Sequence, residues 1–220
     1  MKDADKRKTI ERYNERLAEF GHDPRTLGWP KRRHVLRYSV LLGQWDLAGA
    51  SLLDFGCGFG DMYAYCAEHA PGVRYSGVDI NEKLIEEGKK LYPEAQLRVA
   101  DGDPQGTYDY VVSSGVHNAK IEDNWGWIEE TFALFDRLAT KGFALNFLSN
   151  RVEYEHEHTY HSDPVRVLEL AYRYSNRVVL RNDYMPFEFT VLVDKRTEFD
   201  KEFVVYPEFL GLITDEADGA

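Results

Sequence analysis

Apolar residues in the first fifty positions recur at the spacing of a helix. Residues 3–20 carry an apolar residue every three or four positions, which predicts an amphipathic helix, and 31–46 show the same pattern. The segment between them contains glycine and proline, which interrupt helices. The pattern therefore predicts a helical extension over 1–47. Its apolar positions are Ile10, Tyr13, Leu17 and Phe20 in the first helix, and Val35, Leu36, Val40 and Leu41 in the second.

From residue 51 onward, short apolar runs alternate with amphipathic segments. Alternation of this kind predicts a parallel sheet that is covered by helices on both faces. Two adjacent strands with no helix between them then close the pattern. The predicted strands are 51–55, 73–79, 96–101, 108–114, 142–149, 177–183 and 187–194. The predicted helices are 61–69, 81–92, 124–139 and one that begins at Pro164, with Asp163 as its N-cap.

The composition limits the class of protein. The chain has 220 residues, 43% of them hydrophobic, which is typical of one domain over 1–220. No apolar run approaches the ~18 residues of a membrane span, and the charged N-terminal stretch does not resemble a secretory signal. Two cysteines make no disulfide framework, so we expect a cytoplasmic protein. The net charge of −11 argues against a nucleic-acid partner, whose phosphates attract clustered Lys and Arg.

Three glycines at alternate positions follow the first predicted strand, in the sequence SLLDFGCGFGD at 51–61. Such a cluster indicates a turn with positive φ or a backbone in contact with a ligand. A strand, a glycine turn and a helix form the cofactor-binding corner of a doubly wound sheet. The spacing G-x-G-x-G differs from the G-x-G-x-x-G of dinucleotide binders. Asp79 ends the next strand, where a carboxylate can bind both hydroxyls of a ribose.

The segment DFGCGFG at 54–60 resembles the first motif of the class I S-adenosylmethionine-dependent methyltransferases. The resemblance covers about residues 31–195 and implies an α/β fold with a doubly wound, mostly parallel seven-stranded sheet whose last strand is reversed. It also implies S-adenosyl-L-methionine as the cofactor of a single methyltransferase domain. The later segments follow the family's order and are GVDIN at 77–81, VADGD at 99–103, YDYVVSSGV at 108–116 and FALNFLS at 143–149.

The resemblance implies roles for individual residues around this cofactor. The glycine turn would lie against the methionine part and the ribose, with Cys57 as a small filler. Asp54 would orient the turn or meet the amino group through water, and Asp79 would bind the ribose. Asp101 would accept a hydrogen bond from the adenine amino group, although Asp79 and Asp101 could instead cap a helix or turn. The expected cofactor-binding residues are Trp29, Arg37, Asp54, Gly56, Cys57, Gly58, Gly60, Asp79, Ile80, Asp101, Gly102 and Ser114.

The segment before the first strand carries a second resemblance. LGW at 27–29 and LRYSVLL at 36–42 are similar to the approach helix in a subset of small-molecule methyltransferases. In that subset an arginine clamps the carboxylate of the cofactor. Arg37 is the candidate for this role, with Trp29 folded over the site. The helical register could equally place Arg37 in solvent.

His117 and Asn118 follow the fourth predicted strand, where the acceptor should meet the methyl group. Methyl transfer depends largely on holding the acceptor close and aligned, and a hydroxyl acceptor usually also needs a base. His117 is the candidate base, since an ordinary histidine titrates near neutral pH. The alternative is a hydrogen-bonded loop histidine. Asn118 is an expected substrate contact.

The segment 150–163 contains three histidines among acidic residues and tyrosines. His156 and His158 are a possible metal-ligand pair, but an exposed polar loop explains the composition as well, and we expect no metal. A lid over the substrate is the favoured interpretation, because Tyr154 and Tyr160 offer aromatic faces to a small ligand or a sulfonium. His161 is a further expected substrate contact.

The favoured function is methyl transfer to a small-molecule acceptor. Motifs of base-modifying enzymes, an Asn or Asp before Pro-Pro-aromatic and a Pro-Cys pair, do not occur in the sequence. One alternative keeps the cofactor but changes the chemistry, to 3-amino-3-carboxypropyl transfer or cyclisation of the cofactor. Another is a non-catalytic partner subunit with a degenerate site. We expect a monomer or homodimer that binds neither nucleic acid nor membrane.

Overall fold

The computed structural model describes residues 1–29, 33–100 and 102–214, and its centre is a seven-stranded sheet. The strand order is β3-β2-β1-β4-β5-β7-β6. β7 runs antiparallel to both neighbours, and the other pairs are parallel. The expected fold class is therefore confirmed, reversed last strand included. The strands are β1 (Ser51–Phe55), β2 (Arg74–Asp79), β3 (Gln96–Val99), β4 (Tyr108–Ser114), β5 (Ala139–Leu148), β6 (Arg177–Arg181) and β7 (Glu188–Asp194).

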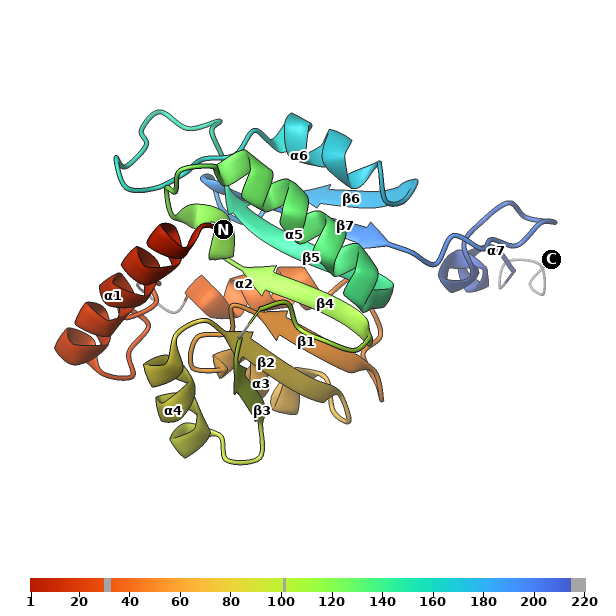
Figure 1. Cartoon of the computed structure of the whole chain (residues 1–220). Coiled ribbons are helices and arrows are strands. Elements are labelled where there is room, and N and C mark those ends of the chain that lie inside the picture. The colour runs from red at the N-terminus through yellow and green to blue at the C-terminus, as the bar shows by residue number, and fades with distance from the viewer. Residues whose placement is uncertain (30–32, 101, 215–220) are drawn as a thin grey trace.

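Helices cover both faces of this sheet (Figure 1). Apolar residues of α2 and α3 share one core with β1 and β4, and those of α5 and α6 share a second core with β4, β5 and β7. Asn81, Asp123 and Asp163 each cap a helix by accepting a hydrogen bond from a first-turn amide. The helices are α1 (Asp3–Phe20), α2 (Arg33–Leu42), α3 (Asp61–His69), α4 (Glu82–Leu91), α5 (Asn124–Leu138), α6 (Pro164–Ala171) and α7 (Gly211–Thr214), with short 3-10 helices η2 (Val116–Asn118) and η3 (Pro207–Phe209).

Several element boundaries differ from those expected, by one to four residues. The second helix spans 33–42 instead of 31–46, and residues 31 and 32 lie outside the described residues. β3 ends at Val99 rather than at 101. Residue 101 lies outside the described residues. β5 begins at Ala139 rather than at 142, because its first residue already pairs with Tyr108 of β4.

The direction of winding changes at β1, which pairs with β2 on one side and β4 on the other. Ligands of doubly wound sheets bind beyond the carboxyl ends of the strands at such a switch point. Figure 1 shows α1 lying across this edge of the sheet, with the loop after β5 beside it. The side chain of Asn81 fixes part of α1 there, since Nδ2 donates to the Ile10 carbonyl at 3.3 Å and to Oδ1 of Asn14 at 3.1 Å.

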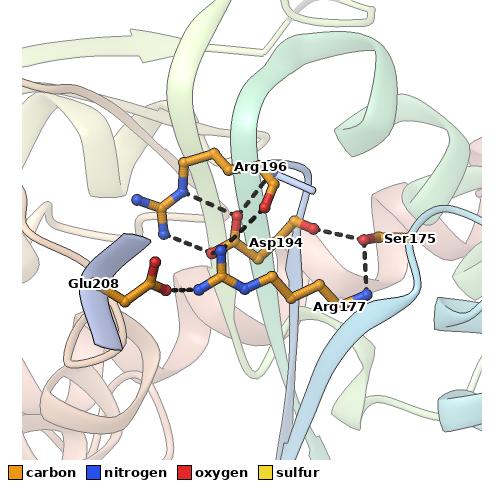
Figure 2. Close-up of polar contacts among 5 residues, drawn as sticks. All are labelled: Ser175, Arg177, Asp194, Arg196 and Glu208. Atoms are coloured by element: carbon orange, nitrogen blue, oxygen red, sulfur yellow. Dashed lines mark hydrogen bonds and ion pairs between the residues drawn. The ribbon is translucent and has the colours of Figure 1, made fainter. Parts of the chain in front are cut away.

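A cluster of charged side chains ties the segment after β7 to the sheet (Figure 2). Asp194 pairs with Arg196 at 2.5 Å and with Arg177 at 3.6 Å, and Arg177 also pairs with Glu208 of η3. The Ser175 hydroxyl donates to the Asp194 carbonyl at 2.6 Å. The segment then extends away from the sheet to α7, at the opposite end of the molecule from α1 (Figure 1).

Candidate active site

A cavity lies where α1 meets the carboxyl ends of β1, β2 and β4. It encloses about 130 Å³, and its walls come from both expected and unexpected parts of the chain. Six of the expected site residues line it: Trp29, Gly56, Gly58, Asp79, Ile80 and Ser114. The predicted glycine corner, the end of β2 and the end of β4 therefore meet in one place.

The glycine turn follows β1 and is held to β2 by backbone hydrogen bonds. The amides of Gly56 and Cys57 both donate to the Val78 carbonyl, at 2.8 and 3.0 Å. Gly56 has φ 78° and Gly58 has φ 57°, a left-handed region that side chains disfavour. A Cβ at Gly58 would also lie 3.0 Å from both terminal methyls of Leu27, which lines the same cavity. The turn thus leaves backbone exposed to the cavity where a side chain would narrow it.

Asp79 joins the end of β2 to this turn. One carboxylate oxygen accepts the Gly58 amide at 2.8 Å, and the other accepts the Asn81 amide at 2.8 Å. Burial raises the pKa of Asp79, and these amide hydrogen bonds oppose the shift. Each carboxylate oxygen has a further lone pair, so Asp79 can also accept hydrogen bonds from a diol in the cavity. Asp79 therefore caps the turn, as one of the two interpretations of the sequence predicted, and it also lines the cavity.

Asp54, Cys57 and Gly60 lie behind the turn rather than at the cavity. The Asp54 carboxylate accepts the Tyr75 hydroxyl at 2.8 Å inside the core, and burial raises the pKa of Asp54 to about 7. Burial also raises the pKa of the Cys57 thiol, which agrees with a small filler. Gly60 N-caps α3 and packs against Leu97. These three residues shape the turn from the core side.

The expected adenine contacts are Ile80, Asp101 and Gly102. Asp101 lies outside the described residues. Gly102 is exposed, has φ 80° and has no atom near the position of a Cβ. Ile80 and Ala100, at the ends of β2 and β3, both line the cavity and give it an apolar wall.

Arg37 is buried beneath Trp29. Its guanidinium forms a two-point ion pair with Glu188 of β7, with Nε donating at 2.7 Å. The Cζ atom lies 3.7 Å from the ring centroid of Trp29, and Trp29 lines the cavity. Nη1 is buried without a hydrogen-bond partner in the described part of the chain. The alternative of a solvent-exposed Arg37 is therefore excluded. Glu188 already neutralises the group that was expected to clamp a carboxylate, and Arg37 itself does not line the cavity.

His117 does not fit the expectation of a base that faces the acceptor. It is 2% exposed, stacks on Phe147 at 5.5 Å between ring centroids, and is absent from the described cavity wall. Neither ring nitrogen has a hydrogen-bond partner among the described residues, which also excludes the hydrogen-bonded loop histidine. Burial, with a smaller effect of the N-terminal ammonium, lowers the pKa of His117 to about 3. The residue is a neutral member of an aromatic cluster, which sequence position alone did not indicate.

Two polar groups near the end of β4 remain available. Ser114 lines the cavity, and its Oγ is buried with no hydrogen-bond partner in the residues described. Asn118 accepts the Leu148 amide at 3.1 Å through Oδ1, while its Nδ2 likewise has no partner there. Gly115, which lines the cavity, lies between them in the chain, and the Trp29 ring covers it so closely that a Cβ would clash. Of the two, only Ser114 lines the cavity; Asn118, an expected substrate contact, does not.

The loop 150–163 lies beside the cavity, but its aromatic residues do not enter it. Tyr154 is 71% exposed, and Tyr160 packs against the core under α5 and α6. Both ring nitrogens of His161 are engaged, by the Ser149 carbonyl at 2.7 Å and the Thr159 hydroxyl at 3.1 Å. The three residues expected to contact substrate are therefore not at the cavity wall. Within the described ranges, no three His, Cys, Asp or Glu side chains are grouped to hold a metal ion.

Residues of α1 form the wall that sequence reasoning missed. Thr9, Ile10 and Tyr13 line the cavity, together with Met1. The helical spacing of Ile10 and Tyr13 did indicate an apolar face, but it did not show what that face covers. Trp127 of α5 also lines the cavity and contacts the His117 ring, at 5.7 Å between centroids. None of the described helices is both long and apolar enough to cross a membrane.

Sequence comparison finds relatives over the central part of the chain. A sequence model of the methyltransferase domain matches residues 53–139. A protein of Mycobacterium tuberculosis that is named as a methyltransferase is 28% identical over 156 residues, which are 66% of this chain and 93% of the relative.

Structural comparison extends the likeness to most of the chain. The magnesium protoporphyrin IX methyltransferase of Synechocystis PCC 6803, crystallised with S-adenosylmethionine, matches with a TM-score of 0.62 at 17% identity, covering 86% of this chain and 96% of that one. A TehB-like S-adenosylmethionine-dependent methyltransferase of Corynebacterium glutamicum matches with a TM-score of 0.53 at 23% identity, covering 87% and 98%. At these identities the likeness shows a shared fold.

Proposed function

We propose that this chain, which belongs to the class I S-adenosylmethionine-dependent methyltransferases, transfers a methyl group from S-adenosylmethionine to a small-molecule acceptor. The observation that carries the proposal is the pair formed by Asp79 and the Gly58 amide at the cavity, 2.8 Å apart. A ribose diol needs a carboxylate there, and the neighbouring methionine part needs backbone without side chains. Both requirements fit the residues present.

The cofactor, when bound, supplies an electrophilic methyl group on a sulfonium. Asp79 would hold the ribose, Ile80 would lie against the adenine, and the glycine turn would lie along the methionine part. Ser114 would position the acceptor through its hydroxyl, which has no hydrogen-bond partner among the described residues, and Trp29, which covers Gly115, would exclude water. Holding two reactants in line supplies much of the rate enhancement for such a displacement.

The described cavity wall favours an acceptor that needs alignment more than proton removal. Its titratable side chains are those of Asp79 and Tyr13. Asp79 is engaged by two amides, and burial raises the pKa of Tyr13, which keeps that phenol neutral. We therefore expect a neutral amine or an activated carbon as the accepting atom. The net charge of −11 supports a small molecule rather than a nucleic acid.

Mass spectrometry of the products tests the proposal. The chain is incubated with S-adenosylmethionine that carries a deuterated methyl group and with pools of small acceptors. Methyl transfer yields S-adenosylhomocysteine and a labelled product. Methylthioadenosine in its place would show aminocarboxypropyl transfer or cyclisation of the cofactor. Failure of the chain to bind the cofactor in a calorimetric titration would instead favour a non-catalytic subunit.

A further inference from the structure

A second, more open cleft adjoins the cavity on its outer side. It has a volume of about 550 Å³ and lies between α1, the residues after η2 and the loop 150–163. Its charged wall residues are Lys8, Arg12 and Lys120, with Glu157 as the acidic one, and His158 also lines it. The proposed chemistry of the first cavity does not use any of these residues.

The cleft contains more basic than acidic side chains, and the carboxylates of the described residues form no ion pair with its Lys and Arg. Lys8, Arg12 and Lys120 form no ion pair in the part of the chain that the structure describes. In contrast, Lys2, which immediately precedes α1, pairs with Glu122 at 2.5 Å. These three cations therefore remain available to a ligand.

Three cations of α1 lie on one face of the helix. Lys8, Arg12 and Arg16 follow one another at intervals of four residues, which stacks like charges on one face of the helix. Like charges at this spacing destabilise a helix by roughly 0.2–0.5 kcal/mol per pair. Arg16 offsets part of this by donating to the carbonyls of Thr26, at 2.8 Å, and Arg25. Within the described ranges, the side chains of Lys8 and Arg12 make no such hydrogen bond, and an anion in the cleft would reduce the repulsion between them.

His158 reports the same positive environment from the opposite wall. Partial burial lowers the pKa of His158, and the charges of Arg12, His156 and Arg16 lower it further. Glu157 opposes them only weakly. The loop is held to this wall by its backbone, because the Lys120 amide donates to the His158 carbonyl at 3.1 Å and Ala119 forms a β-bridge with Thr159.

The two spaces adjoin each other. Thr9, Tyr13 and Ala119 line both the inner cavity and the basic cleft. A single elongated molecule that passes these three residues would have one end beside Ser114 and the other between Arg12 and Lys120. Figure 1 shows α1 and the loop after β5 near the same edge of the sheet.

Taking the proposed function as given, we propose that the basic cleft binds an anionic group, a carboxylate or a phosphate, at the far end of the methyl acceptor. Arg12 and Lys120 would pair with the anion, and Lys8 and His158 would border it. Arginine suits this role because its planar guanidinium can donate two hydrogen bonds to one carboxylate or phosphate. The cleft would thus select acceptors by charge and length while the inner cavity aligns the accepting atom.

Two cleft variants and one control test the anion site directly. Arg12→Gln removes a cation from a partly exposed position and Lys120→Gln from an exposed one, where substitutions hardly change stability. Lys201→Gln removes an exposed lysine from the C-terminal segment, which lies at the other end of the molecule (Figure 1). Inorganic phosphate and acetate are titrated into each protein at low salt and followed by calorimetry or NMR. Comparing the affinities for the two anions shows whether the site prefers a phosphate or a carboxylate.

We expect at least one of the two anions to bind the unmodified protein saturably. Each cleft variant should weaken that binding about tenfold or more, as the loss of a charged hydrogen bond does, and Lys201→Gln should change it less than twofold. Equal anion binding in all four proteins, or none in any, would overturn the proposal. Much tighter cleft-dependent binding of a single-stranded oligonucleotide would overturn the assignment to a small molecule.

The cofactor titration keeps this result separate from the proposed function. S-adenosylmethionine should bind all four proteins equally, because Arg12 and Lys120 do not line the inner cavity. Loss of cofactor binding in the unmodified protein would refute the proposed function and leave the anion measurements standing. Once an acceptor is known, Arg12→Gln should raise its KM about tenfold with little change in kcat if the acceptor is anionic. An unchanged KM would contradict the inference.

Discussion

Replacing Asp79 by alanine perturbs both the glycine turn and the proposed cofactor site. The substitution removes the acceptor of two amide hydrogen bonds, from Gly58 and Asn81, each 2.8 Å long. A donor left unpaired costs about 1–3 kcal/mol, so we expect a measurable loss of stability. A ribose diol would in addition lose its hydrogen bonds to a charged acceptor, worth about 1.5–3 kcal/mol. The dissociation constant for S-adenosylmethionine should therefore rise roughly 10- to 150-fold.

Asp200→Ala is a matched control for this prediction. The Asp200 carboxylate also accepts two backbone amides, from Glu202 at 2.9 Å and Phe203 at 2.8 Å, but it lies in the C-terminal segment. Calorimetric titration of S-adenosylmethionine into both variants, with a thermal melt of each, separates folding from binding. Asp200→Ala should keep the affinity of the unmodified chain. A folded Asp79→Ala protein with unchanged affinity would refute the assignment of the ribose site.

Three further predictions concern other buried positions. Gly58→Val should abolish cofactor binding while the fold survives, because a side chain there meets Leu27 at the cavity wall. Calorimetric titration with S-adenosylmethionine measures the binding, and circular dichroism checks the fold. Retained affinity for S-adenosylmethionine would contradict the prediction. His117→Phe should change turnover less than about threefold and keep or raise the melting temperature, because a neutral ring stacked on Phe147 is replaced by an apolar one. A fall in turnover of ~10²–10⁴, the size of a general-base contribution, would show that His117 is the base. Burial raises the pKa of Asp54 from 3.8 to about 7, so the folded chain retains a proton that the unfolded chain releases, and stability should fall as the pH rises from about 4 to 7. Denaturant unfolding at several pH values should show a flatter slope for Asp54→Asn, and identical slopes would be evidence against the buried carboxyl.

The fold could be predicted because its signals are local and periodic. The alternation of strands and helices, the cap at Asp163 and the glycine turn each depend on neighbouring residues. Parallel pairing then follows from the alternation, since a helix returns the chain to the same edge of the sheet. The strand ends that carry Asp79 and Ser114 are brought to one cavity for the same reason.

The remainder of the site depends on packing, which spacing does not encode. His117 is separated from Ser114 by two residues, yet a 3-10 turn directs it into the aromatic core. Arg37 is paired with Glu188, which is 151 positions away in the sequence, and no local pattern predicts such a partner. The sequence likewise did not predict that α1 forms a wall of the cavity, because an apolar helix face indicates burial but not which part of the molecule it packs against.

The most direct test of the central claim is a titration of the unmodified chain with S-adenosylmethionine, followed through the backbone amide signals of an isotopically labelled sample. We predict saturable one-to-one binding, with the largest shifts at Gly56, Gly58, Ile80 and Ser114, and small shifts at Asp200 and the rest of the C-terminal segment. Absence of binding, or shifts confined to residues outside the cavity wall, would contradict the account.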